Sequence, residues 1–299
     1  MSRPVPVPLV KAHAYGNDFL LVAERALSGA DDLPALARRL CDRHRGIGAD
    51  GLMTVDERPL GASVRLLNAD GSHSEVSGNG VRCVAAWLAH RRALTTSATL
   101  VIQTGAGDKA LVLLRADGLR FTFRAEMGPP TELREETLDV NGTAVTAAVL
   151  RVGNPQCVVL GPATESRLHA IAGPLAVHPF FPEGTNVELA TIESPNHVRI
   201  LIWERGVGPT EASGTGACAA AVAAMAYGGA ARTVDVISPG GSQRVEWRED
   251  GLYLTGWAEL VGEVRWLAGQ PASLKGRRDK AEGCLLPYRL RFSAACWWQ

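Results

Sequence analysis

Two serines, Ser77 and Ser213, each begin a Ser-Gly-x-Gly turn that leads directly into a segment rich in Ala and Val with helical spacing. The turns read SGNG and SGTG, and their serines lie 136 positions apart. The free backbone N–H groups and partial positive charge at a helix start suit a carboxylate or phosphate, and glycines let a ligand approach closely. Because serine is also a preferred N-cap, one such turn would indicate only a capped helix. Two matching turns predict a duplicated unit with one shared ligand site.

Turn asparagines form a second group of candidate ligand contacts. Each one alone is typical of a tight turn. Together they supply neutral donors and acceptors suited to a zwitterionic ligand. The group consists of Asn17, Asn68, Asn79, Asn154 and Asn186.

Glu204 and Arg205 are adjacent in the stretch WERG, residues 203–206. Neighbours on a strand point to opposite faces, so both reach one ligand only if the strand ends there. Gly206 favours such an end. The spacing alone is equally compatible with two solvated charges.

The stretch GIGADG, residues 46–51, matches the pattern G-x-G-x-x-G. A dinucleotide-binding loop needs a strand before it and a helix after it. Here a helix is predicted before and a strand after, which argues against that function. No Walker A lysine, HExxH motif or zinc-like Cys spacing occurs either, so we expect no cofactor and no metal.

The predicted elements repeat in the same order in both halves of the chain. The first half gives strand–turn–strand, helix, two strands, the SGNG turn with its helix, and a β-meander over 98–125. The second half gives strand–turn–strand over 144–161, a helix over 166–178, two strands, the SGTG turn with its helix, and a closing meander over 234–264. This order predicts an α+β fold with two pseudo-symmetric lobes, each a mostly antiparallel sheet around a central helix, with a cleft between them.

The expected domain limits follow from this repeat. We expect one lobe at residues 1–125 and the second at 126–256, with EMGPP at the boundary. Residues 257–299 would supply a return strand to the first lobe and a C-terminal tail. That basic and aromatic tail is either a poorly ordered appendage or a small interaction patch.

The composition is that of a globular protein in water. The 299 residues are 46% hydrophobic and 21% charged, and Lys plus Arg equals Asp plus Glu at 31 each. Nothing in this balance attracts nucleic acid or membrane, and no apolar run is long enough to span a bilayer. The proline-broken start is unlike a signal peptide, and the six cysteines read as reduced thiols, so we expect a cytoplasmic protein. Cys83 and Cys218, on the two glycine-led helices, are interpreted as small core residues.

Over roughly residues 9–265 the chain resembles the diaminopimelate epimerase family of cofactor-independent amino-acid epimerases. The resemblance rests on stretches in one order: HAYGNDF, CDRHRGIGADG, NADGS, GNGVRC, VGNP, FPEGTNVE, WERGVG and GTGACAAAV. It implies two similar lobes with the active site between them and a cytoplasmic homodimer. It also implies conversion of LL- to meso-diaminopimelate for lysine and peptidoglycan-precursor synthesis.

The resemblance also implies the substrate contacts. Backbone groups of Gly78 and Asn79, and of Gly214 and Thr215, would hold a carboxylate at the two helix starts. The implied side-chain contacts are Asn17, Asn68, Asn79, Asn154, Asn186, Glu204 and Arg205.

The catalytic positions depart from the family pattern. The family carries cysteine where this chain has Ser77 and Ser213, and those thiols face the substrate α-carbon from opposite sides. One thiolate removes the proton and the other thiol returns one. A serine hydroxyl is a far weaker acid than a thiol and needs an adjacent base. Gln156 stands where the family usually has a histidine.

Three functions stay open at this point. The chain is a diaminopimelate epimerase of full or reduced rate that uses Ser77 and Ser213, or it is a related amino-acid racemase or a dehydratase that needs one base. The third alternative is a non-catalytic amino-acid-binding relative, or an engineered trap in which serines replaced cysteines.

Overall fold

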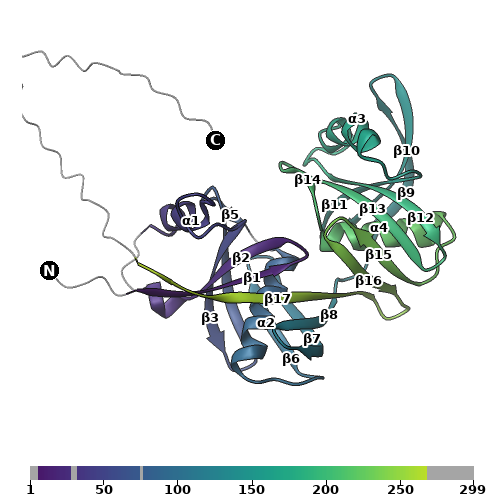
Figure 1. The fold of residues 1–299 in the computed structure, drawn as a ribbon. Coiled ribbons are helices and arrows are strands. Elements are labelled where there is room, and N and C mark those ends of the chain that lie inside the picture. Colours follow the sequence, from purple (N-terminus) through teal and green to yellow (C-terminus); the bar gives the residue numbers. More distant parts are fainter. Residues whose placement is uncertain (1–5, 28–31, 75–76, 268–299) are drawn as a thin grey trace, which may run out of the picture.

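The computed structural model describes residues 6–27, 32–74 and 77–267. Figure 1 shows two lobes, and strand β17 (Leu252–Trp266) runs from one to the other. The predicted C-terminal tail lies outside the described residues. The expected limits of the two lobes, 1–125 and 126–256, stay predictions.

The first lobe is a closed ring of strands around helix α2 (Gly78–Arg91). Hydrogen-bonded neighbours follow the order β17–β1–β2–β3–β4–β6–β7–β8 and return to β17. The strands are β1 (Val7–Ala14), β2 (Asn17–Ala23), β3 (Gly51–Arg58), β4 (Gly61–Asn68), β6 (Thr99–Thr104), β7 (Gly107–Asp117) and β8 (Arg120–Glu126). A two-residue strand, β5 (His73–Ser74), pairs with β4.

The second lobe repeats this strand order around helix α4 (Gly214–Tyr227), but its ring is open, because β9 and β17 do not pair among the described residues. Its strands follow the order β9–β10–β11–β12–β13–β15–β16–β17. They are β9 (Thr131–Val140), β10 (Thr143–Val152), β11 (Asn154–Leu160), β12 (Asn186–Ser194), β13 (His197–Glu204), β15 (Thr233–Ser238) and β16 (Gly241–Trp247). The short β14 (Gly208–Thr210) pairs with β13.

Parallel strand pairs occur at matching places in the two lobes. Parallel neighbours cannot be joined by a hairpin and need a crossover, usually a helix. In the sequence, helix α1 (Leu33–Cys41) connects the parallel strands β2 and β3, and α2 comes between the parallel strands β4 and β6. Helix α3 (Glu165–Ala176) lies between β11 and β12, and α4 lies between β13 and β15. The predicted α+β fold of two pseudo-symmetric, mostly antiparallel lobes is thus confirmed.

The two central helices are buried on nearly all sides because strands surround them. Residues 217–224 of α4 are buried without exception, and six of these eight are alanine. Small side chains let the surrounding strands approach the helix axis closely. Cys83 and Cys218 are fully buried in these cores, as predicted.

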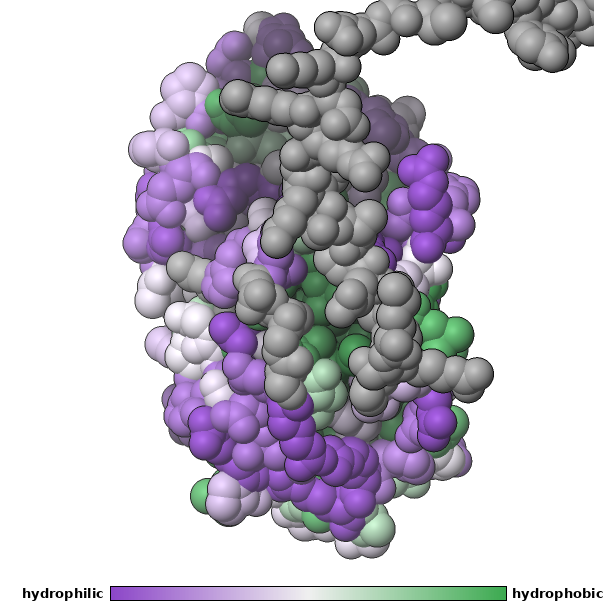
Figure 2. All heavy atoms as spheres, turned by 90° about the vertical axis from the view of Figure 1, so that its left-hand side faces the viewer, coloured by the Kyte–Doolittle hydropathy of each residue, from purple (hydrophilic) through white to green (hydrophobic). Residues whose placement is uncertain are grey.

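The described part of the chain holds no helix that is long and apolar enough to cross a membrane. Hydrophilic residues cover most of the face in Figure 2, and hydrophobic ones reach the surface near its middle.

Candidate active site

The two serine turns have the same local geometry. Ser77 and Ser213 are the N-caps of α2 and α4, both with extended backbone angles. Ser77 Oγ accepts a hydrogen bond from Gly80 N, and Ser213 Oγ accepts one from Gly216 N, each at 3.1 Å. Both serines therefore cap their helices. The hydroxyl oxygen is the acceptor in each cap, so the hydroxyl proton takes no part in it.

A chain of hydrogen bonds joins the first turn to the second. Arg82 Nη2, one turn along α2, donates to Asn79 Oδ1 at 2.5 Å and to Gln243 Oε1 at 3.1 Å. Gln243 Nε2 in turn donates to the carbonyl oxygen of Ser213 at 3.4 Å. The two turns, far apart in sequence, thus belong to one buried polar network.

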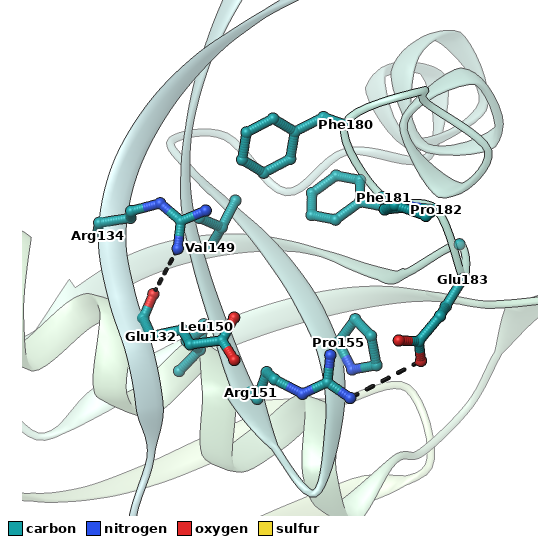
Figure 3. A pocket seen from close by; sticks show the side chains of 11 residues that line it. Glu132, Arg134, Val149, Leu150, Arg151, Pro155, Phe180, Phe181, Pro182 and Glu183 are labelled. Atoms are coloured by element: carbon teal, nitrogen blue, oxygen red, sulfur yellow. Dashed lines mark hydrogen bonds and ion pairs between the residues drawn. The ribbon is translucent and has the colours of Figure 1, made fainter.

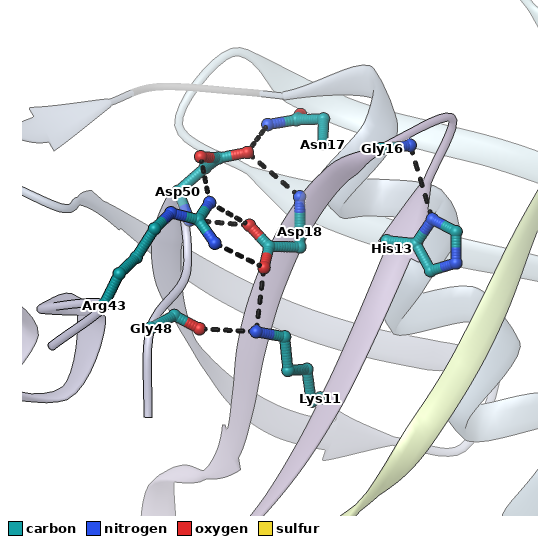
Figure 4. A network of polar contacts seen from close by, with 8 residues as sticks. All are labelled: Lys11, His13, Gly16, Asn17, Asp18, Arg43, Gly48 and Asp50. Atoms are coloured by element: carbon teal, nitrogen blue, oxygen red, sulfur yellow. Dashed lines mark hydrogen bonds and ion pairs between the residues drawn. The ribbon is translucent and has the colours of Figure 1, made fainter. Parts of the chain in front are cut away.

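Asn17 lies beside the first turn and is positioned by charged neighbours (Figure 4). Asn79 Nδ2 donates to Asn17 Oδ1 at 3.2 Å. Asn17 Nδ2 donates to Asp50 Oδ2 at 2.7 Å, as Figure 4 shows. Arg43 bridges Asp50 and Asp18, with its Nη2 at 2.8 Å from an oxygen of each. Arg43 and Asp50 both belong to the stretch CDRHRGIGADG, so this stretch holds Asn17 in place through the ion-pair cluster.

Asp18 carries a stabilised negative charge in this cluster. Burial alone would raise its pKa, but the ion pairs with Arg43 and Lys11 hold it below the ordinary value. Asp18 also accepts from Asp50 N, so the charge helps to fix the loop that carries Asp50.

In the second lobe, Asn186 and Arg205 are brought together at the end of β13. Asn186 Oδ1 accepts from Arg205 N at 2.9 Å, and Arg205 Nη1 donates to the carbonyl oxygen of Glu183 at 2.6 Å. Strand β13 ends at Glu204, so Arg205 already lies in the following turn, as Gly206 indicated.

Glu204 is the acidic group beside the second serine. Burial raises its pKa, and neighbouring hydroxyls of Thr210 and Ser213 lower it in part. Thr210 Oγ1 has no hydrogen-bond partner among the described residues, and Ser213 Oγ lies 3.5 Å from Thr215 Oγ1. A carboxylate with a raised pKa beside a serine hydroxyl can act as its base.

Glu188 on β12 is a second acidic group, and it lies next to the first turn of α4. It is fully buried, and neither carboxyl oxygen has a hydrogen-bond partner among the described residues. Burial first, and then the charge of Glu204, raise its pKa well above the ordinary value. Glu188 therefore keeps its proton to a higher pH than an exposed glutamate does.

Gln156 occupies a buried position in the next strand. Its Nε2 donates to Asn154 Oδ1 at 2.6 Å, while its Oε1 has no partner among the described residues. Gln156 and Asn186 are register partners of β11 and β12. Asn68, in contrast, is exposed and donates to Ser72 Oγ within its own turn.

Comparison with known proteins decides the family. The family model described as diaminopimelate epimerase matches residues 9–133 and 148–261. The chain belongs to the diaminopimelate epimerase family. This confirms the resemblance that the sequence stretches indicated.

Similar members of the diaminopimelate epimerase family match most of the chain. The diaminopimelate epimerase of Desulforudis audaxviator is 42% identical over 86% of this chain and 98% of its own length. That of Corynebacterium glutamicum is 37% identical over 87% of this chain and 98% of its own. The rice (Oryza sativa subsp. japonica) chloroplastic enzyme is 37% identical over 84% of this chain and 78% of its own.

Solved structures extend the fold beyond the diaminopimelate epimerase family. A hydroxyproline epimerase from Agrobacterium vitis aligns with a TM-score of 0.64 and 17% identity over 89% of this chain and 94% of its own. A phenazine biosynthesis protein of the PhzF family from Bacillus anthracis aligns at 0.61 and 14%, over 88% and 99%. At these identities the likeness concerns the fold alone.

The buried cysteines do not replace the thiols of the diaminopimelate epimerase family. Burial raises the pKa of Cys218 to about 12, although Arg82 lowers it in part, and burial also raises the pKa of Cys83. Neither thiol forms a thiolate at neutral pH. Among the described residues, no cluster of His, Cys, Asp and Glu could hold a metal ion.

Two cavities lie outside the set of residues that the diaminopimelate epimerase resemblance implies. One of about 120 Å³ in the second lobe is lined by Arg134, Arg151, Phe180 and Phe181, among others (Figure 3). A second, of about 190 Å³, lies between Tyr15 of the first lobe and Arg244 of the second. Neither is lined by Ser77 or Ser213.

Sequence reasoning missed three buried polar residues that the diaminopimelate epimerase fold brings to the two turns. They are Arg82, Glu188 and Gln243. The first two occur inside the quoted stretches GNGVRC and FPEGTNVE, which was the available signal. Gln243 stands in the closing meander with no motif around it.

Proposed function

We propose that this chain converts LL-diaminopimelate to meso-diaminopimelate by removing and returning the α-proton, with no organic cofactor. It would act in lysine and peptidoglycan-precursor biosynthesis, in the cytoplasm and as a homodimer. The observation that carries the proposal is the hydrogen-bonded chain between the two serine turns, within a chain of the diaminopimelate epimerase family.

Substrate binding would use the two helix starts and the turn side chains. The N-termini of α2 and α4 present free N–H groups and positive dipole ends to the α-carboxylate. The contacts proposed there are Gly78 and Asn79 from one turn, and Gly214 and Thr215 from the other. The remaining proposed contacts are Asn17, Asn68, Asn154, Asn186, Glu204 and Arg205.

Proton transfer on the second-lobe side would pass through Ser213 and Glu204. The proton leaves Ser213 Oγ for the Glu204 carboxylate as the oxygen takes the substrate α-proton; reversal of these transfers returns a proton. The raised pKa of Glu204 makes its carboxylate a better base than an exposed glutamate. The positive helix ends stabilise the negative charge that develops on the substrate carboxylate.

Proton transfer on the first-lobe side would use Ser77. Among the described residues, the hydrogen bond that Ser77 Oγ makes is the capping bond from Gly80 N. Glu204 gives Ser213 an acidic neighbour, which favours faster exchange on the second-lobe face. This asymmetry also keeps a racemase or dehydratase with one base as the second candidate function.

The deciding experiment is α-proton exchange in deuterated water with the purified protein. LL-diaminopimelate and meso-diaminopimelate are incubated separately, and deuterium at the α-carbons and the LL-to-meso ratio are followed by NMR. We expect deuterium uptake together with interconversion, without added pyridoxal phosphate or metal.

Other outcomes separate the alternatives. Exchange without inversion indicates a one-base enzyme. Binding in calorimetry without exchange indicates an amino-acid-binding relative or a trap. No binding of either stereoisomer to folded protein contradicts the proposed substrate.

A further inference from the structure

Arg82 is a buried cation whose hydrogen-bonding partners are all neutral. It is 3% exposed and lies in the second turn of α2. Its guanidinium donates to the side-chain oxygens of Asn79 and Gln243 and packs 5.6 Å from the ring centre of Tyr15. Its Nε has no partner, and no carboxylate lies within 4.0 Å of it among the described residues.

This environment leaves the charge of Arg82 uncompensated. A buried charge is costly unless it is paired, and neutral amide oxygens satisfy hydrogen bonds without balancing the charge. Arginine does not escape the cost by losing its proton, since its guanidinium stays charged in proteins. A buried, unbalanced arginine is therefore suited to pairing with an anion.

The guanidinium lies behind both helix starts. Arg82 follows Asn79 by one helical turn and donates to it directly. A Cβ atom on Gly214, the first residue of α4, would lie 4.0 Å from Arg82 Nη2. The residues proposed to hold the α-carboxylate, Asn79 and Gly214, are therefore both adjacent to this cation.

We propose that Arg82 is a positioning residue whose counter-charge is the α-carboxylate of the bound amino acid. It orients the Asn79 amide toward the carboxylate and adds a fixed positive charge to the two helix dipoles. When the α-proton leaves, negative charge spreads onto the carboxylate, and Arg82 stabilises that state too. This inference rests on the proposed function for the substrate but extends to any ligand with an α-carboxylate.

Two substitutions test the charge. Arg82→Gln removes the charge and keeps hydrogen-bonding capacity, while Gln243→Glu places a carboxylate next to Arg82. If Arg82 awaits a counter-ion, both variants weaken binding of LL-diaminopimelate about tenfold or more. They do so although one removes the guanidinium and the other strengthens its hydrogen bond. Arg82→Lys, which keeps a charge, retains more binding than Arg82→Gln.

Melting temperatures without and with ligand supply the second measurement. Gln243→Glu raises the melting temperature of the ligand-free protein, because it supplies the missing charge, and reduces the further rise caused by LL-diaminopimelate. L-Lysine, with one α-carboxylate, and cadaverine, with none, serve as probes. L-Lysine stabilises the wild type more than it stabilises either variant, and cadaverine stabilises all three equally.

A different result is expected if Arg82 only stabilises the fold and does not pair with the ligand carboxylate. Gln243→Glu would then bind LL-diaminopimelate as tightly as the wild type, and that result overturns the inference. If Arg82→Gln does not fold, the Gln243→Glu and Arg82→Lys comparison decides alone. If the wild type does not bind diaminopimelate but L-lysine stabilises it more than it stabilises either variant, the proposed substrate is wrong and the role of Arg82 stands. If no α-carboxylate ligand distinguishes the wild type from Gln243→Glu, the inference is wrong.

Discussion

Gly216 and Glu188 are in direct contact, and a Cβ atom at position 216 would lie 2.5 Å from Glu188 Oε1. The same added Cβ atom would lie 3.2 Å from the Cβ atom of Ser213. Glycine at the third position of α4 therefore makes room for a buried acid directly behind the serine. The contact couples the SGTG turn to β12.

The substitution Gly216→Ala should destabilise the protein, because the added methyl group overlaps the Glu188 carboxyl in a packed interior. We expect a loss of about 1–3 kcal/mol in the free energy of unfolding, measured by denaturant titration. Gly78→Ala in the first turn is the matched control, since a Cβ atom there meets nothing within 4 Å. Equal effects of the two substitutions would contradict the contact.

The substitution Glu188→Gln should remove a pH dependence of stability. The folded pKa of Glu188 lies above its unfolded value, so the folded state holds a proton that the unfolded state releases. The free energy of unfolding of the wild type therefore falls as pH rises from the ordinary glutamate value toward the raised one. Glutamine carries no such proton, so the variant gains stability relative to the wild type as pH rises above the ordinary glutamate pKa. Parallel pH profiles for the two proteins would show that Glu188 is not protonated in the fold.

The substitution Asp18→Asn should destabilise the ion-pair cluster around Asn17. Arg43 and Lys11 hold the folded pKa of Asp18 below its ordinary value, against the effect of burial. Its stabilisation is therefore present above the unfolded pKa and disappears as pH falls through the lower, folded one. We expect a loss of about 1–3 kcal/mol at neutral pH that becomes smaller in acid, measured by denaturant titration at several pH values. Arg134→Gln, at an exposed ion pair with Glu136, is the control and should cost less than about 1 kcal/mol.

The double substitution of Ser77→Cys with Ser213→Cys should raise the epimerisation rate. A thiolate forms near neutral pH far more easily than an alkoxide, and each tenfold in rate needs only about 1.4 kcal/mol of barrier. We expect a gain of about tenfold or more in LL-to-meso conversion, with smaller gains from the single variants. The Ser77→Cys variant should gain more than Ser213→Cys, because Ser213 already has Glu204 beside it. A fast wild type that the cysteines slow down would mean that the site has evolved true serine chemistry.

The substitution Gln156→His, added to the two cysteines, should raise the rate further. Gln156 is fully buried with an unpartnered oxygen, and an amide cannot act as a general acid or base near neutral pH. An imidazole can, which is worth about tenfold or more when it assists a nucleophile or acid. The measurement is the pH profile of kcat, which should acquire a new inflection near neutral pH. Gln156→Leu, with no such group, should leave the profile unchanged.

The sequence by itself determined the elements around the site and their repetition. Both serine caps, the Asp32 cap of α1 and the tight turn at Tyr15 and Gly16 between β1 and β2 follow from signals within a few residues. Such signals act through the local backbone, so they can be recognised without knowing the fold. The family stretches pointed in the same way to the asparagines and to Glu204.

Only the tertiary structure decided which polar residues are buried and what they contact. In β12, Glu188 alternates with Val187 and Leu189, a pattern typical of a strand with one face in water. The strand is instead covered on both faces, by α3 on one and α4 on the other, so all three residues are buried. Likewise, nothing local links Arg82 to Gln243, which are 161 residues apart. Burial and charge balance depend on which distant segments meet, and that meeting is a property of the whole fold.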